Sequence, residues 1–534
     1  RGGALGASAT ADAEESGAII ELGNVTFKNN TVFKTESSTP TFIDNVDREG
    51  VERNYNGNGA VAHFTAKCEL HLYGNVVFEG NVAPSKGGAL YLTNQAKVKS
   101  IEGAQITFIK NESGSYGGAI YATNNSEVNL SDATFEENSG YRGGAITALG
   151  GSVVTLNNVN ATANTSSSAG GFAYLELSEI SITGESKLVN NESTGSSAGV
   201  FYLEGSKLSL TGSEGAPIVI SGNASKSQGG VICAYIASVT TTTTDESTGE
   251  TTEETETIRS NITVNYVSFD SNKANVSTQY GGGAIYASNT DVTIDNSVFN
   301  ANEAVYGGAI SLYSGAVLTA SNTSFTNNTA DANGGVMYTS KSTATFENII
   351  VNGNKVTGYD TTETVTDEET GETTTVDKHI DGNGGAFFFN TSSEATFNGV
   401  SASGNTAEYG GFIYIGNKAS VTVSGGTNEF TENTASKNGG AFFVGESTSL
   451  TLTGIKASGN TAENGGAIYV NEAALFTVNG DKNEFIENIG TSENDQYGAG
   501  AIYIYKTQAT ISNTVFDKNT GNCGGAVGIR ATSA

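Results

Sequence analysis

The sequence lacks tryptophan and contains only one methionine, three prolines and three cysteines among its 534 residues. So little proline is typical of a chain whose backbone N–H groups are nearly all needed for hydrogen bonds, because proline has none to donate. Cys68, Cys233 and Cys523 lie far apart and form no Cys-x-x-Cys motif, which argues against a zinc ribbon or a redox pair. We expect them to occupy small apolar positions of the interior rather than to form disulfides.

The sequence also contains no apolar run long enough to span a bilayer and no pattern of a secretory signal peptide. Positive charge is scarce, since 26 lysines and arginines stand against 56 aspartates and glutamates, for a net charge of -30. A surface this acidic repels nucleic acid and anionic membranes. We therefore expect no nucleic acid partner and no membrane insertion by this segment.

Glycine, in contrast, is abundant, and much of it recurs in one hexamer, seen most clearly as Gly-Gly-Ala-Ile-Tyr-Val at 465–470. Copies of this hexamer begin at Gly87, Gly117, Gly143, Gly170, Ala198, Gly229, Gly282, Gly307, Gly334, Gly384, Gly410, Gly439, Gly465, Ala499 and Gly524. The spacing is 25 to 34 residues, except for two gaps of 53 and 50 that follow Gly229 and Gly334. A repeat of this length predicts a solenoid, in which each unit buries its apolar face against the next.

The columns of the hexamer predict which way its strand faces. The fourth and sixth positions are apolar in nearly every copy, as in Ile468 and Val470, whereas the fifth is mostly tyrosine. Residues two apart share one face of a strand, so the fourth and sixth positions are expected in the core and the tyrosines outside. The leading glycines fit a tight corner and a close approach of neighbouring coils.

A second motif, Phe-x-x-Asn, follows the hexamer, as in Phe299 to Asn302 and Phe325 to Asn328. The phenylalanine fills the core, and the asparagine turns the chain and stacks into a ladder of amides. Between the two motifs lie alternating segments such as Val292-Thr293-Ile294. Together they predict an all-β fold, a single parallel, right-handed β-helix with about three short strands per coil of roughly 25 residues.

The domain prediction is one continuous β-helix over residues 1–534. Residues 1–60 carry the repeat less regularly, and the two long gaps hold threonine-rich, acidic insertions at 240–257 and 361–378. Threonine runs that flank a glycine turn predict protruding β-hairpins. These hairpins are expected to leave from different edges, either as binding fingers or as tolerated surface insertions.

The alternation of Gly-Gly-Ala-Ile with Phe-x-x-Asn resembles the repeats of the chlamydial polymorphic membrane proteins and related adhesin-like surface proteins. The resemblance covers nearly the whole chain. It implies an extracellular, adhesin-like passenger β-helix, although this chain has no barrel-like C-terminal segment, no tryptophan and few cysteines. What carries over is the repeat architecture and surface exposure, and not a receptor or an export route.

Two sets of residues are candidate surface features. The outward aromatic stripe would stack on sugars or protein, or would only stiffen the coil stack by packing ring on ring; it comprises Tyr91, Tyr121, Tyr174, Tyr202, Tyr286, Tyr338, Tyr414, Tyr469 and Tyr503. Asn-x-Ser/Thr sequons, which permit N-glycosylation without proving it, begin at Asn24, Asn29, Asn111, Asn124, Asn129, Asn160, Asn164, Asn191, Asn223, Asn261, Asn275, Asn322, Asn327 and Asn390.

No catalytic, cofactor-binding or metal-binding residues are assigned. Asn289-Thr290-Asp291 matches the triplet of polygalacturonase-like hydrolases, but the partner motifs of those enzymes are missing. His63, His71 and His379 show no metal-ligand spacing, and acidic clusters predict at most weak Ca²⁺ binding.

These observations predict a non-enzymatic, extracellular structural or adhesive β-solenoid at a cell surface. Its partners are other copies of itself end to end, or a host or cell-surface protein or glycan. Both ends fall inside the repeat, so the chain is either a processed piece or a subunit that polymerises head to tail into a filament. The alternative function is a β-helix polysaccharide lyase or hydrolase.

Overall fold

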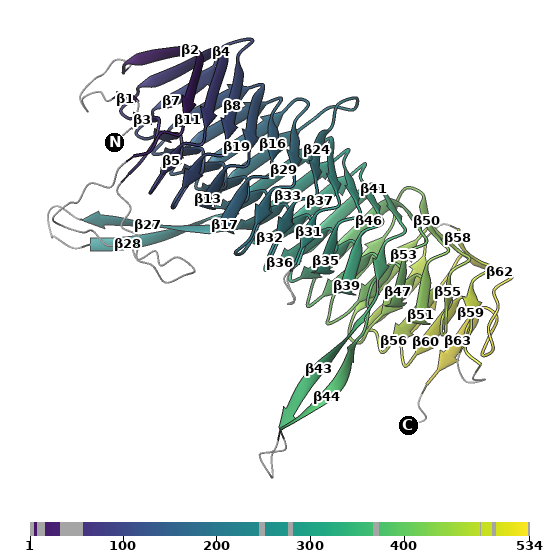
Figure 1. The fold of residues 1–534 in the computed structure, drawn as a ribbon. Coiled ribbons are helices and arrows are strands. Elements are labelled where there is room, and N and C mark those ends of the chain that lie inside the picture. The colour runs from purple at the N-terminus through teal and green to yellow at the C-terminus, as the bar shows by residue number, and fades with distance from the viewer. Residues whose placement is uncertain are drawn as a thin grey trace. The chain divides into compact units, whose positions relative to one another are not determined.

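The computed structural model describes residues 5–7, 17–32, 57–244, 251–275, 281–366, 373–480, 482–493 and 498–531 (Figure 1). The chain divides into two compact units, Arg1–Ser268 and Phe269–Ala534, each of which is considered by itself. In the described residues every regular element is a β-strand, and apart from two hairpins the strands pair in parallel from coil to coil. The predicted all-β parallel β-helix is therefore confirmed in each unit.

Some predicted features lie outside the described residues. They are the first Gly-Gly motif at 2–4, the segment from Phe42 to Asn45, and the acidic hairpin tips at 245–250 and 367–372. The single continuous β-helix over 1–534 stays a prediction.

One coil of the first unit shows how the sequence motifs become strands. The Gly-Gly hexamer forms β10 (Ile120–Thr123), and the alternating segment forms β11 (Glu127–Ser131). The phenylalanine of Phe-x-x-Asn lies in β12 (Ala133–Glu136), and a short β13 (Ser139–Arg142), which the sequence did not predict, completes the coil. We call the stack containing β10 sheet A, that of β11 and β12 sheet B, and that of β13 sheet C.

Sheet A contains the strands of the Gly-Gly hexamers. In the first unit it contains β1 (Leu5–Ala7), β3 (Ala62–Phe64), β6 (Leu90–Leu92), β10, β14 (Ile146–Leu149), β18 (Ala173–Glu176), β22 (Phe201–Glu204) and β26 (Ile232–Tyr235). In the second unit it contains β32 (Ile285–Ser288), β36 (Ile310–Tyr313), β40 (Met337–Ser340), β45 (Phe387–Asn390), β48 (Ile413–Ile415), β52 (Phe442–Val444), β56 (Ile468–Asn471), β60 (Ile502–Tyr505) and β63 (Val527–Arg530). The hexamers align in register, as Ile310 with Met337 shows.

Each of the two leading glycines has its own steric reason. Gly307 adopts a φ of 63°, which favours glycine because a Cβ meets the following backbone there. Gly308 has an ordinary φ, but a Cβ built on it would lie 2.1 Å from the carbonyl oxygen of Gly335 in the next coil. The first glycine thus makes the corner, and the second lets adjacent coils approach to hydrogen-bonding distance.

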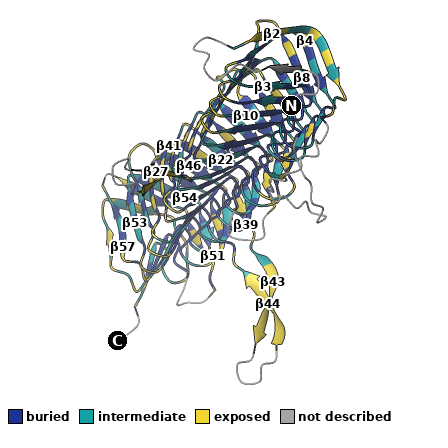
Figure 2. Cartoon of the chain, turned by 90° about the vertical axis from the view of Figure 1, so that its left-hand side faces the viewer, coloured by how far each residue is buried: buried dark blue, intermediate teal, exposed yellow. Residues whose placement is uncertain are grey.

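The interior of each unit is filled by the predicted columns. Ile310 and Leu312, the fourth and sixth positions of one hexamer, are 0% exposed, as is Phe325 of the following Phe-x-x-Asn motif. Figure 2 shows this burial as dark blue on the stacked strands, in contrast to the yellow of β43 and β44. The predicted inward orientation is therefore correct.

Buried asparagines form the predicted amide ladder. In the second unit Asn328 donates from Nδ2 to the carbonyl oxygen of Phe299 at 2.9 Å and to Oδ1 of Asn354 at 3.0 Å. Its own Oδ1 accepts both the backbone N–H and Nδ2 of Asn302, each at 3.0 Å. The same pattern in the first unit links Asn81, Asn111, Asn138, Asn164, Asn191 and Asn223. The buried turn is thus polar but fully hydrogen-bonded, as a buried amide requires.

Both insertions form antiparallel hairpins, as predicted. In the first unit β27 (Ala237–Thr244) pairs with β28 (Thr251–Ile258), directly after β26 of sheet A. In the second unit β43 (Tyr359–Thr366) pairs with β44 (Thr373–Ile380), after β42 (Lys355–Val356) of sheet C. Each hairpin extends a few residues beyond the predicted bounds and projects from its coils in Figure 1. Because they leave after strands of different sheets, the prediction that they leave the coil at different points is correct.

The asparagine ladder makes a specific stability prediction. Asn328→Ala removes the partners of two donors on Asn302 and of the carbonyl oxygen of Phe299, all of them buried. We expect a loss of about 3 kcal/mol or more, because each unsatisfied buried group costs about 1–3 kcal/mol. The measurement is the urea unfolding midpoint.

The neighbouring Asn327→Gly serves as the control. Asn327 is exposed and has a φ of 56°, which glycine tolerates. We expect a change of about 0.5 kcal/mol or less. Equal midpoints for the two variants would contradict a stabilising role for the buried ladder.

Candidate binding surfaces on sheet A

The predicted tyrosine stripe points away from the core, but most of its rings are covered. Tyr121, Tyr174, Tyr286, Tyr338 and Tyr503 are buried, and Tyr91, Tyr202, Tyr414 and Tyr469 are half-buried. The rings stack on the coil above and below, as in Tyr469 on Tyr503, whose centroids lie 5.4 Å apart with the planes at 3°. Ring faces that contact other rings cannot stack on a sugar. The geometry favours the interpretation of the stripe as a stiffening stack.

At two copies of the hexamer in the first unit, the cationic residue before the Gly-Gly pair adds a second cover. The guanidinium carbon of Arg142 lies 5.2 Å from the ring centroid of Tyr174, and Nη1 donates to the hydroxyls of Tyr116 and Tyr174 at 3.3 Å. Lys86 lies 4.9 Å from the ring centroid of Tyr121. These cation–π contacts enclose the outer side of the stack.

The regular stack is interrupted at β26, where the fifth position is Cys233 and not tyrosine. Cys233 pairs in register with Tyr202, so the ring of Tyr202 has a small thiol where the next ring would lie. Tyr235 contacts it from two positions further on, with centroids 5.9 Å apart and planes tilted by 42°. Burial raises the pKa of the Cys233 thiol to about 12, which leaves it an unreactive spacer.

A groove of about 370 Å³ opens at this interruption, next to the start of the hairpin strand β27. It is lined by Ser196, Ser197, Tyr202, Glu204, Gln228, Tyr235 and Ile236. The hydroxyl of Ser197 donates to Oε1 of Gln228 at 2.6 Å, which fixes the amide at one wall. Two rings and several hydrogen-bonding groups thus converge on one concave surface, a combination typical of ligand sites.

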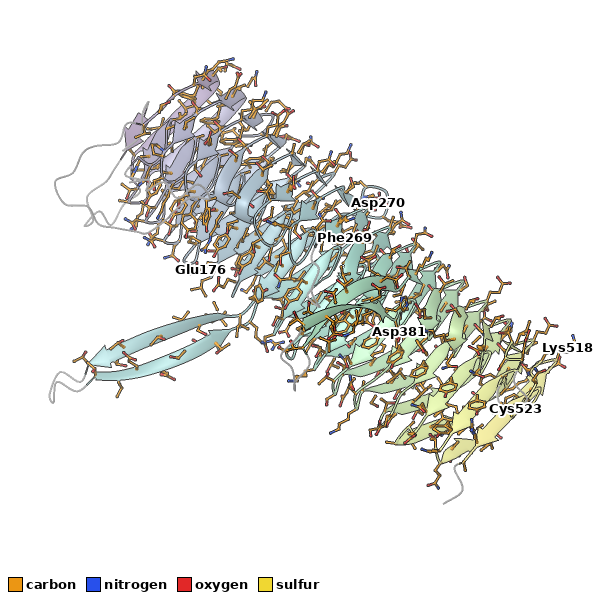
Figure 3. All side chains as sticks on the ribbon, turned by 60° about the horizontal axis from the view of Figure 1, so that its bottom comes forward. Glu176, Phe269, Asp270, Asp381, Lys518 and Cys523 are labelled. Carbon is orange, nitrogen blue, oxygen red and sulfur yellow. The ribbon has the colours of Figure 1, made fainter. Side chains whose placement is uncertain are left out.

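Glu204 gives the groove negative charge, and a second carboxylate, Glu176, lies one coil away. Glu204 of β22 pairs in register with Glu176 of β18, which Figure 3 labels, so like charges stand one coil apart. The pKa of Glu204 is raised, mainly by burial and to a smaller extent by the negative charge of Glu176. The hydroxyl of Tyr174 donates to Oε2 of Glu204 at 3.4 Å. Burial also raises the pKa of the phenols of Tyr174 and Tyr202, so both stay protonated and can donate at physiological pH.

Asn289-Thr290-Asp291, the triplet weighed as catalytic, occupies the turn between β32 and β33 (Asp291–Asp295). Asn289 has a φ of 50°, and the buried hydroxyl of Thr290 donates to the carbonyl oxygen of Ser288 at 3.0 Å. The first two residues therefore have a structural explanation as a turn.

The asparagines of the sequons fall into a buried group and a more exposed group. Asn111, Asn164, Asn191 and Asn223 belong to the buried ladder and are 0% exposed. A glycan on any of them is incompatible with the folded ladder. Most of the others, such as Asn124 and Asn261, are exposed and stay possible glycosylation sites.

The cysteines are all free thiols in the structure. Cys68 and Cys233 are buried, as predicted, whereas Cys523 is only half-buried. Among the described residues there is no helix that is long and apolar enough to span a membrane.

The comparison with protein families confirms the predicted resemblance. The model of the Chlamydia polymorphic membrane protein repeat matches residues 75–93, 105–123, 217–235 and 266–288. Each match joins a Phe-x-x-Asn-type strand to the Gly-Gly strand that follows, and the third includes Gln228 and Tyr235 of the groove. No curated protein and no solved structure matches the chain. Repeats of this kind on a β-solenoid fit a surface, adhesin-like passenger.

The charge of the groove predicts a pH-dependent effect of Glu204→Gln on stability. Because the folded-state pKa of Glu204 is raised, the folded chain holds this proton more firmly than the unfolded chain, and parental stability falls as pH rises through that pKa. We expect Glu204→Gln to unfold at higher urea than the parent at about pH 7, with the difference shrinking below about pH 4.

The control is Glu112→Gln, which changes an exposed carboxylate of β9 (Glu112–Ser113) in the same unit. We expect little change at either pH. A Glu204→Gln effect that is absent at neutral pH, or the same at both, would contradict the burial and repulsion described for Glu204.

Proposed function

We propose that the chain is a non-enzymatic, extracellular β-solenoid that acts as an adhesive passenger at a cell surface. The matches to the polymorphic membrane protein repeat carry this proposal. The fold supports it, because apolar columns and the asparagine ladder fill the interior of the coils and leave ligand binding to the outer surface.

The groove between Tyr202 and Tyr235 is the binding surface in this proposal, and its partner is a glycan. The half-buried rings offer apolar edges to C–H groups of a sugar, and Ser196, Gln228 and Glu204 offer hydrogen bonds to its hydroxyls. The carboxylates Glu204 and Glu176 repel acidic polysaccharides, as does the net charge of -30. A neutral or amino sugar fits this chemistry best.

The test is binding of the full chain to immobilised neutral, amino and acidic oligosaccharides. We expect binding to neutral or amino sugars that Tyr235→Ala and Gln228→Ala each weaken about tenfold, or about 1.4 kcal/mol. Tyr73→Ala is the matched control, because Tyr73 is 45% exposed in the same unit but lies outside the groove. Preference for acidic polymers, or equal losses in all variants, would contradict the assignment of the groove.

One observation favours the enzymatic alternative, a polysaccharide hydrolase. Glu204 and Glu176 form a pair of carboxylates in which one has a raised pKa, and retaining glycosidases use such a pair as acid and nucleophile. In our proposal Glu204 is a hydrogen-bond acceptor. Incubation with the bound oligosaccharide should release no reducing ends; release that Glu204→Gln abolishes while binding persists would establish the hydrolase instead.

Head-to-tail assembly into a filament stays a prediction. Electron microscopy of the purified chain at rising concentration tests it, and strict monomers would exclude it.

A further inference from the structure

The second hairpin is held at its foot, where Asp360 of β43 pairs with His379 of β44. Almost all residues of both strands are exposed, so the hairpin has no apolar face to pack against the coils. Within the part of the chain that the structure describes, the two strands form a sheet of their own. The side chains at the foot therefore set the orientation of the hairpin.

The imidazole of His379 links three strands at this foot. Its Nδ1 lies 2.6 Å from Oδ1 of Asp360 on β43. Its Nε2 lies 2.6 Å from Oε1 of Glu408 on β47 (Thr406–Tyr409) of sheet C. The start of β43 passes close to the same carboxylate, since a Cβ built on Gly358 would lie 2.5 Å from that Oε1. One ring thus connects both strands of the hairpin to the coil.

Both contacts require a protonated ring. A neutral imidazole has one N–H, so it donates to one carboxylate and presents a lone pair to the other. The hydrogen bonds to Asp360 and then to Glu408 raise the pKa of His379 accordingly. The side chain of Asp360 is 89% exposed, whereas that of Glu408 is 14% exposed. When the proton is lost, Asp360 is therefore the carboxylate that returns to water, and Glu408 keeps the remaining N–H.

Other charges surround the foot. The remaining titratable groups on the segments around it are Lys378, Glu363, Asp381, Lys437 and Tyr409. Lys378 pairs with Glu363 at 2.8 Å, within the hairpin. Lys437 of β51 (Thr434–Asn438) lies 2.7 Å from Oε2 of Glu408 and 2.7 Å from Oδ1 of Asp381, which follows β44 and is labelled in Figure 3. A second ionic bridge thus ties the end of β44 to the coil.

This second bridge keeps its charges while His379 titrates. Hydrogen bonds to Asp381 and Glu408 raise the pKa of Lys437, whose ammonium also rests 4.9 Å from the ring centroid of Tyr409. Burial raises the pKa of Glu408, but its hydrogen bonds with Lys437 and His379 outweigh burial and lower it. The imidazole is therefore the group whose charge changes near neutral pH.

We propose that His379 is a pH-sensitive switch, which fastens the start of β43 to sheet C when its ring is protonated and frees it when the proton is lost. The contacts are complete below the ordinary pKa of histidine, about 6.5, and are lost as the pH rises through the raised pKa of His379. Above that pKa the hairpin is held through β44 alone, by Asp381 and Lys437. The inference does not depend on the adhesive function.

The test is a nitroxide spin label on β43, attached at Thr364→Cys in the full chain. Cys523→Ser removes the half-buried thiol, and the other two cysteines are buried. Label mobility is measured by electron paramagnetic resonance from about pH 5 to about pH 9, and the pKa of His379 by NMR of the same chain. We expect mobility to rise with pH, with its midpoint at the pKa of His379.

Two variants separate charge from shape. His379→Arg carries a positive charge throughout this pH range, and His379→Gln carries none. We expect the label to stay restricted in the first and mobile in the second, with no pH step in either. The melting temperature of each variant shows whether it folds like the parent.

The first hairpin provides the matched control, because it contains no histidine. A label at Thr241→Cys on β27 should show no step near the pKa of His379. A β43 label whose mobility in the parent is independent of pH, or changes with a midpoint away from that pKa, would overturn the proposal. So would a step that persists in folded His379→Gln.

Discussion

In-register stacking of parallel coils is the constraint on which the rest of each unit depends. Coils at hydrogen-bonding distance leave no room for a Cβ at the second glycine of the hexamer, as Gly308 against Gly335 shows. The same register places equivalent residues of successive coils above one another. A side chain in such a column must therefore pack well against another copy of itself. Asparagine suits a buried column because its amide both donates and accepts along the stack. Tyrosine suits a covered outer column because its ring packs on another ring.

Regular columns therefore make closed surfaces, and the groove on sheet A lies at one place where the tyrosine column is broken. Cys233 interrupts the tyrosine stack and leaves space beside Tyr202, into which Glu204 and Tyr235 project. His379, which the second insertion contributes, likewise contacts Glu408 of a regular strand. In both cases side chains of regular coils meet a residue that departs from the repeat.

The columns could be predicted from the sequence because each rests on local alternation that the repeat displays many times. That logic predicted the buried Ile310 and the Asn328 ladder, whereas the hairpins were predicted from threonine runs that flank a glycine turn. It did not extend to the covering of the tyrosines, since Arg142 reaches Tyr174 from another coil. Glu176 and Glu204 are the residues that directly follow two successive hexamers, so a comparison of these following residues would have predicted that the two carboxylates lie one coil apart. The contact of His379 with Glu408, 29 residues apart, has no spacing signature, because the insertion between coils sets it.

The composition of the hairpins explains why the residues that join them to the coil determine their orientation. Their strands are almost entirely exposed threonine and acidic residues, with contacts such as that between the hydroxyls of Thr240 and Thr255. A two-stranded hairpin without an apolar face is marginally stable by itself. Its orientation must then be set where it joins the coil. In the second unit His379 and Asp381 make that junction through Glu408 and Lys437, so these ion pairs control how firmly the hairpin is held.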